Sequence, residues 1–289
     1  MNRSRALDAF LEGLVDYAGL FPPAALAMPE AVERYARYSL SSDAPMLGRF
    51  VVPATRLPEF AAASLSTAVP WRLSVLAGAA DVAAIAAFNL AHGDRARIDT
   101  IEAKADDTVT IAALAHAFGD AYTVYVEIAV RHDPAPLVAA LAAHGLRAKI
   151  RTGAMIAEAF PASAEVLRFL TACLRAGVPF KATAGLHHPL RGEYALTYEP
   201  GSARGTMFGF LNVFLAAVLL REGTPPSELV SLLEERDADA IGVEPDALRW
   251  REWRVSSVQI AAARAAFAGS FGSCSFEEPM QDLTSLRLI

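Results

Sequence analysis

The sequence has few cysteines and no run of basic residues. Its two cysteines, Cys173 and Cys274, lie far apart and form no CxxC or Cys/His cluster with the spacing of a zinc site. We therefore expect a reducing, cytoplasmic location. The net charge is −6, and no basic stretch is interleaved with aromatic residues. This balance argues against nucleic acid as a partner.

Long apolar runs are also missing. The most apolar one, Met207 to Leu220, is too short to cross a bilayer, which takes about 17–25 residues. It predicts a buried helix or an interface helix, and the second reading would make the chain a homo-oligomer. The N-terminal segment mixes Asp8 and Glu12 into a helical pattern and lacks the apolar core of a secretory signal. We expect no membrane partner.

The sequence does contain a regular alternation of short β-rich runs and Ala-rich helical segments. Six β-then-α units in a row predict parallel strands joined by helices. The units recur every 25–30 residues or so, about the size of one βαβ step, and eight steps would close a barrel. The predicted strands are 48–54, 71–77, 97–104, 122–129, 147–153 and 179–185, and the predicted helices lie near 56–65, 80–91, 107–117, 134–144 and 160–175.

We therefore predict one α/β domain over residues 1–289, a (β/α)8 TIM-type barrel. The barrel would comprise residues 46–289, and residues 1–45 would be an N-terminal extension with the Pro-rich loop 16–24. An open doubly wound sheet is the alternative, but no Gly-rich dinucleotide loop follows an early strand. Beyond residue 185 the sequence predicts helices near 206–221, 226–235 and 256–268, a seventh strand near 238–244 and an eighth at 269–276.

Charged residues recur at alternate positions of four successive predicted strands. Residues two apart in a strand point to the same face of the sheet. A strand of a parallel sheet that is buried on both faces needs no such residues, whereas barrel active sites lie at the carboxyl ends of the strands. The pattern predicts a polar pocket there, with buried ion pairs that only specify the fold as the alternative. The residues that share this face are Glu102, Lys104, Glu127, Lys149, Arg151 and Lys181.

Lys181 lies within the otherwise apolar strand VPFKATAG, although lysine is rarely buried without a partner. Burial and the nearby cations Lys149 and Arg151 would lower its pKa. The neutral amine could then attack a carbonyl and form a Schiff base, while Glu102 or Glu127 moves protons. The same cations could instead bind a carboxylate or a phosphate, which needs no pKa shift.

The stretch RAKIRTG, followed after a helix by AGVPFKATAG, resembles the fifth and sixth strands of class I aldolases of the deoxyribose-phosphate aldolase type. The resemblance implies a Schiff-base lysine on the sixth strand, at Lys181, with Thr183 beside it. It also implies a second lysine on the seventh strand, which we do not find in the sequence. The run FGSCSF is similar to the phosphate-binding turn of that family, which implies anion contacts at Gly272, Ser273 and Ser275.

Further candidates lie in the loops. His187 and His188 follow the sixth predicted strand and could act as acid, base or metal ligands, or simply be exposed. Cys274 has no histidine near it in sequence, so we expect an inert thiol. The loop 16–24 could cover the mouth of the barrel or close its base. In the first case Asp16 would be a site candidate.

We therefore expect a Schiff-base-forming, aldolase-like lyase that acts on a small carbonyl metabolite, phosphorylated or carboxylated, and needs no cofactor and no metal. One alternative is a metal-dependent lyase or isomerase on the same barrel, which would use Glu102, Glu127 and His187 or His188. Another is a non-catalytic binder of a small anionic metabolite. The predicted catalytic residues are Lys181, Lys149, Glu127 and Glu102, and the predicted substrate-binding residues are Arg151, Thr183, Lys104, His187, His188, Gly272, Ser273 and Ser275.

Overall fold

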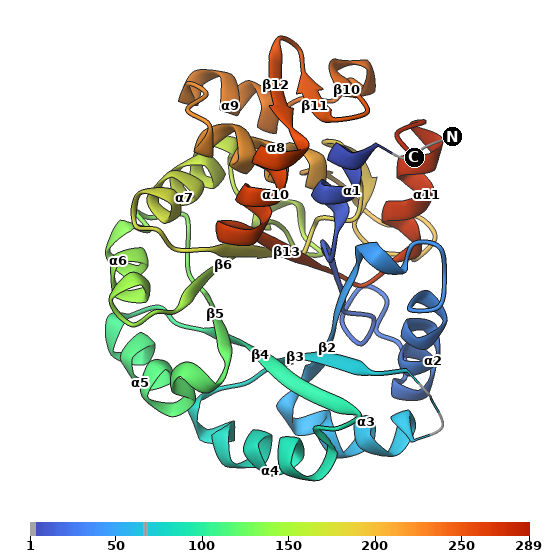
Figure 1. Cartoon of the computed structure of the whole chain (residues 1–289), viewed down its shortest axis with the longest axis vertical. Helices are drawn as coiled ribbons and strands as arrows, with labels where there is room; N and C mark the ends of the chain where they lie inside the picture. Colours follow the sequence, from blue (N-terminus) through green and yellow to red (C-terminus); the bar gives the residue numbers. More distant parts are fainter. Residues whose placement is uncertain (1–3, 66, 68) are drawn as a thin grey trace.

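The computed structural model describes residues 4–65, 67 and 69–289. Within these residues, eight parallel strands close into a barrel, so the predicted (β/α)8 fold is confirmed (Figure 1). The strands follow one another around the ring in chain order. They are β1 (Val15–Tyr17), β2 (Leu47–Pro53), β3 (Trp71–Leu76), β4 (Ala96–Lys104), β5 (Thr123–Glu127), β6 (Arg147–Arg151), β7 (Phe180–Thr183) and β13 (Ala268–Ser273).

Helices surround the ring of strands (Figure 1). The predicted helical segments are confirmed, and several begin where the sequence provides a start signal, such as the proline in the first turn of α2, α3, α6 and α9. The helices are α2 (Met28–Tyr38), α3 (Leu57–Ser64), α4 (Val82–His92), α5 (Thr108–Phe118), α6 (Ala135–Ala143), α7 (Ser163–Arg175), α8 (Phe210–Arg221), α9 (Pro226–Leu233), α10 (Ser257–Ala266) and α11 (Glu277–Ser285).

The first barrel strand lies in the segment that we predicted to be an extension. Residues 1–45 were expected outside the barrel, but β1 pairs with β2 on one side and with β13 on the other, and so closes the ring. Tyr17 packs among aromatic rings that include Tyr35 and Phe50, whereas its neighbour Asp16 bonds to groups inside the barrel. The preceding helix α1 (Arg5–Leu11) contacts α10 and the strand β11 (Ala247–Trp250).

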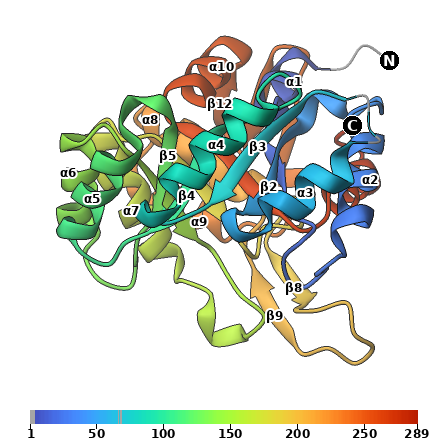
Figure 2. The same cartoon turned by 90° about the horizontal axis from the view of Figure 1, so that it is seen from below.

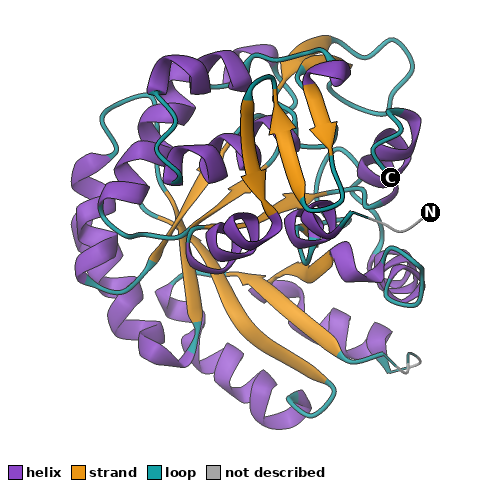
Figure 3. Cartoon of the chain, turned by 45° about the horizontal axis from the view of Figure 1, so that its top comes forward, coloured by secondary structure: helices purple, strands orange, loops and turns teal. Residues whose placement is uncertain are grey.

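The prediction for the seventh strand is wrong. Residues 241–243 form β10 (Ile241–Val243), which pairs with β11 (Ala247–Trp250) and β12 (Trp253–Ser256) in a separate antiparallel sheet outside the ring (Figure 3). The seventh barrel strand is β7, which we counted as the sixth because β1 had been overlooked. The predicted eighth strand is confirmed as β13.

The apolar segment near residue 210 forms α8, which is buried from Phe210 to Leu219. It contacts α7, α9, α10 and β13 of its own chain. The prediction of a buried helix is therefore confirmed. Among the helices that the structure describes, none has the length and apolar character needed to traverse a membrane.

A β-hairpin follows β7 and projects from one end of the barrel (Figure 2). Its strands are β8 (Gly192–Ala195) and β9 (Arg204–Met207). Leu196, just after β8, and Met207, at the end of β9, both line the cavity described next. The hairpin thus forms part of the barrel mouth.

Candidate active site

A cavity of about 320 Å³ opens at the carboxyl ends of the barrel strands. Its charged lining comes from the strands, and loops supply most of its apolar walls. The loop after β1 folds over the mouth and contributes Phe21, Pro22 and Pro23, so the Pro-rich segment covers the mouth of the barrel. Pockets that bind small molecules commonly have this size and this combination of apolar walls with a few polar groups.

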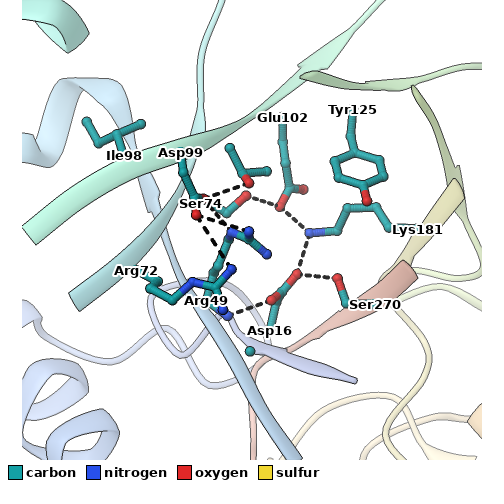
Figure 4. A network of polar contacts seen from close by, with 12 residues as sticks. Asp16, Arg49, Arg72, Ser74, Ile98, Asp99, Glu102, Tyr125, Lys181 and Ser270 are labelled. Carbon is teal, nitrogen blue, oxygen red and sulfur yellow. Dashed lines mark hydrogen bonds and ion pairs between the residues drawn. The ribbon is translucent and has the colours of Figure 1, made fainter. Parts of the chain in front are cut away.

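Lys181 lies inside the barrel between two carboxylates (Figure 4). Its Nζ donates to Asp16 Oδ2 at 2.7 Å and to Glu102 Oε1 at 2.5 Å, and its side chain is 1% exposed. Burial alone would lower the pKa of Lys181, but the charges of Asp16 and Glu102 outweigh it and raise the pKa above its ordinary value. The predicted lowering of this pKa is therefore wrong, and the amine is a fixed ammonium. Lys181 is not among the described residues that line the cavity.

Hydrogen bonds hold both carboxylates beside Lys181 in place. Asp16 also accepts from the hydroxyl of Ser270 and from the backbone N–H of Arg49, each at 2.6 Å. Ser74 donates to Glu102 Oε1 at 2.7 Å (Figure 4). Burial alone would raise the pKa of Glu102, but Lys181 and Lys149 outweigh it and lower the pKa. Glu102 is therefore ionised.

Lys149 is the lysine that reaches the cavity. Its Nζ lies 3.1 Å from Glu102 Oε2 and 3.1 Å from Glu127 Oε2, and its side chain is 6% exposed. The pairing of β5 with β6 sets Glu127 beside Lys149, and the next pairing sets Lys149 beside Lys181. Glu102 binds Lys181 through Oε1 and Lys149 through Oε2. It therefore connects the fully buried lysine to the lysine that lines the cavity.

Glu127 connects Lys149 to the cation nearest the solvent. The Nε of Arg151 donates to Glu127 Oε1 at 2.9 Å, and half of the Arg151 side chain is exposed. Burial alone would raise the pKa of Glu127, but Lys149 and Arg151 outweigh it and lower the pKa. Arg151 lines the cavity, as do Thr183 and Gly272. These three predicted binding residues therefore lie where a ligand would contact them.

Three other predicted binding residues, Lys104, Ser273 and Ser275, lie elsewhere. Lys104 is 67% exposed on its side chain and pairs with Asp106 outside the cavity, because it lies at the very end of β4. The Ser273 side chain is buried, and its hydroxyl accepts from the backbone N–H of Ser275 at 3.3 Å. Ser275 in turn accepts from the backbone N–H of a residue in α11. The hydroxyls of this turn are therefore engaged within the protein.

The two adjacent histidines have different surroundings. His188 Nδ1 lies 2.6 Å from Asp282 Oδ2 and its ring stacks on Tyr194, away from the cavity. His187 lines the cavity, and its Nδ1 lies 3.9 Å from Cys274 Sγ. Folding therefore brings a histidine from 87 positions away in sequence close to the thiol that we expected to be inert.

The metal-dependent alternative requires acidic groups and a histidine to converge. Glu102 and Glu127 instead converge on Lys149, and His187 lies with Cys274 and Glu278. Within the described ranges, no group of three or more His, Cys, Asp or Glu side chains has an arrangement that could hold a metal ion. No observation on these residues therefore favours the metal-dependent reading.

No protein-family model matches the chain, and no curated protein matches it at a significant level. The barrel fold alone is compatible with many activities, so function has to be inferred from the site itself.

Proposed function

We propose that this barrel is an aldolase-like lyase that forms a Schiff base between Lys149 and a small carbonyl compound. The observation that carries the proposal is the position of the Lys149 amine. Of the chain's three lysines, Lys149 alone lines the cavity, and two carboxylates that can accept its proton lie 3.1 Å from its amine. The nucleophile proposed is therefore Lys149 and not Lys181.

The corrected strand count supports the same choice. The class I aldolases that the sequence resembles have their Schiff-base lysine on the sixth barrel strand and a second lysine on the seventh. With β1 counted as the first strand, the sixth strand carries Lys149 and the seventh carries Lys181. On this count Lys181, which we first assigned to the sixth strand, would correspond to the second lysine that the resemblance implies.

The neighbours of Lys149 suit the proton transfers of this chemistry. The amine must lose a proton before its lone pair attacks the carbonyl carbon, and Glu102 Oε2 and Glu127 Oε2 are acceptors at 3.1 Å. Loss of water then gives a protonated imine, which takes up the electron pair when the adjacent carbon–carbon bond breaks. Glu102 is the candidate base for the substrate hydroxyl, because it lines the cavity and Glu127 is not among the described residues that do.

The cavity also limits the kind of substrate. Phe21, Met155 and Met207 give it apolar walls, while its strand residues place charge at the reacting end. Arg151 is half exposed and is the cation best placed to receive a carboxylate of the substrate. We propose a small carbonyl compound with an apolar portion and, at most, one carboxylate.

Borohydride trapping tests the proposal. Protein incubated with a panel of aldehydes and ketones and then reduced should carry a stable adduct on Lys149, located by peptide mass spectrometry. Only three lysines compete, and Lys104 serves as the exposed reference. Lys149→Arg should lose the adduct while keeping the fold, and Lys104→Arg should keep it. An adduct confined to Lys181, or none across the panel, would overturn the assignment.

A non-catalytic binder of a small anionic metabolite is the second candidate. The observation in its favour is that the charges of Lys149 and Arg151 are already matched by Glu102 and Glu127, as in a rigid binding site. A ligand would then raise the melting temperature without any turnover. Thermal shift measurements on the compounds that fail to trap distinguish this case.

A further inference from the structure

A second group of reactive side chains faces the same cavity. Cys274 lies just after β13, lines the cavity and is nearly buried. His187, from the loop after β7, lines it too, with Nδ1 3.9 Å from the sulfur. The hydroxyl of Tyr198, from the loop of the hairpin, lies 3.5 Å from the sulfur and donates to Glu278 Oε2 at 2.9 Å. Two separate loops thus bring polar groups to one thiol.

The surroundings of this thiol favour its anion. Burial alone would raise the pKa of Cys274, but its contacts with His187, Tyr198 and the backbone of Ala24 outweigh burial and lower the pKa. Burial would lower the pKa of His187, but Cys274 and Glu278 raise it to about 10. The cavity thus holds a thiol with a lowered pKa beside an imidazole with a raised pKa.

Other charged groups lie close enough to affect this pair. Glu278, at the start of α11, competes with the sulfur for His187 Nδ1 at 3.4 Å. The hydroxyl of Ser273 also lies 3.4 Å from that nitrogen. Tyr17 from β1, and His188 with its neighbour Asp282, also lie near the pair.

Cys173 provides a reference within the same chain. It is fully buried in α7, and burial raises the pKa of its thiol. It is not one of the described residues that line the cavity. The two cysteines therefore differ in access, in charge environment and in expected reactivity.

We propose that Cys274 and His187 form a second reactive centre, in which the thiolate bonds reversibly to the carbonyl carbon of a small aldehyde held in the cavity. The sulfur lone pair forms the C–S bond, and the C=O π pair moves onto oxygen. His187 Nδ1 gives its proton to that oxygen, so the product is a neutral hemithioacetal and no further reactant is needed. This centre does not depend on Lys149.

Alkylation with iodoacetamide tests whether the thiolate exists. In the native protein, we expect the alkylation rate of Cys274 to reach half of its maximum at a pH below about 8.5, the pKa of an ordinary cysteine thiol. Cys173 should stay unmodified until the protein is unfolded. His187→Gln should move the midpoint up by a unit or more, which lowers the rate at pH 6 about tenfold. An unreactive Cys274, or an ordinary midpoint that His187→Gln leaves unchanged, refutes the thiolate.

A ¹³C-labelled aldehyde tests the covalent step. Butanal labelled at the carbonyl carbon should give a protein-bound hemithioacetal resonance in the Lys149→Arg protein, where no imine can form at the cavity. The Cys274→Ser, Lys149→Arg double variant should lack the signal, and the Cys173→Ser, Lys149→Arg variant should keep it. If circular dichroism shows that the Lys149→Arg protein is folded and the hemithioacetal signal is absent, the proposal of a second centre is overturned. Failure of borohydride trapping on Lys149 overturns only the lyase proposal.

Discussion

Replacement of Lys181 by methionine is the most informative test of the charged barrel interior. Methionine has a similar length but no charge, so Asp16 and Glu102 would lose the ammonium that lies 2.7 and 2.5 Å from them. Both carboxylates are buried, and removal of one partner from a buried ion pair typically costs about 3–5 kcal/mol. We therefore expect Lys181→Met to lose about that much free energy of unfolding at pH 7.

The loss should depend on pH in a defined direction. The pKa of Glu102 is lowered from 4.5, so its pairing stabilises the fold fully above about pH 4.5 and is lost as the pH falls through the lowered value. The pKa of Lys181 is raised from 10.5, so its contribution is complete below about pH 10.5 and is lost above the raised value. The difference between wild type and variant should therefore be largest between these limits and shrink towards pH 3.

Urea unfolding of both proteins at pH 7, 5 and 3.5 measures this difference. Lys104→Met is the matched control, because its exposed side chain should change stability by no more than about 0.5 kcal/mol. If Lys181→Met does not fold, the double variant with Glu102→Gln should recover part of the loss by removing one unpaired charge. A loss below about 1 kcal/mol at pH 7, or one that is the same at every pH, would refute the buried ion-pair reasoning.

Two glycine substitutions test the packing around the network and the cavity. In Gly48→Ala the new Cβ would lie 2.2 Å from Asp16 Oδ1, so we expect urea unfolding to show a loss of about 1–3 kcal/mol in the free energy of unfolding. Gly78→Ala is the control, because its Cβ would meet nothing closer than 4.0 Å and should cost far less. Equal losses in the two variants would contradict this reasoning. Gly272→Ala places a methyl group at the cavity lining, in ordinary contact 3.4 Å from Thr183 Oγ1. We expect an unchanged melting temperature but slower borohydride trapping of bulky ketones. An unchanged trapping rate would show that Gly272 does not contact the substrate.

Strand periodicity was sufficient to identify most of the charged network. Alternation placed Glu102, Glu127, Lys149 and Lys181 on one face, and the structure brings all four together. The same alternation included Lys104, which misses the network because a strand end is not enclosed by its neighbours. Periodicity fixes the face of a side chain but not its depth along the barrel.

The first strand could not be predicted because it has only three residues. The run Val15–Tyr17 is too short for a periodic signal, and its central residue is an aspartate. Without this strand the strand count was shifted by one. Its residue Asp16, which raises the pKa of Lys181, also could not be recognised as a partner, because the two residues lie 165 positions apart in sequence. The pKa of a buried lysine depends on such distant partners, so its direction could not be inferred from neighbouring residues alone.

The seam between β1 and β13 has a consequence for how the chain folds. It joins segments near the two ends of the chain, and the bonds of Asp16 to Lys181 and Ser270 span 165 and 254 positions. Contacts this distant form late and slowly, so a nearly complete barrel with two open edges should exist for some time. Its inner surface carries hydrated carboxylates and ammonium groups in place of the usual branched apolar layers, and this charge should keep the unfinished sheet from associating with other chains during synthesis.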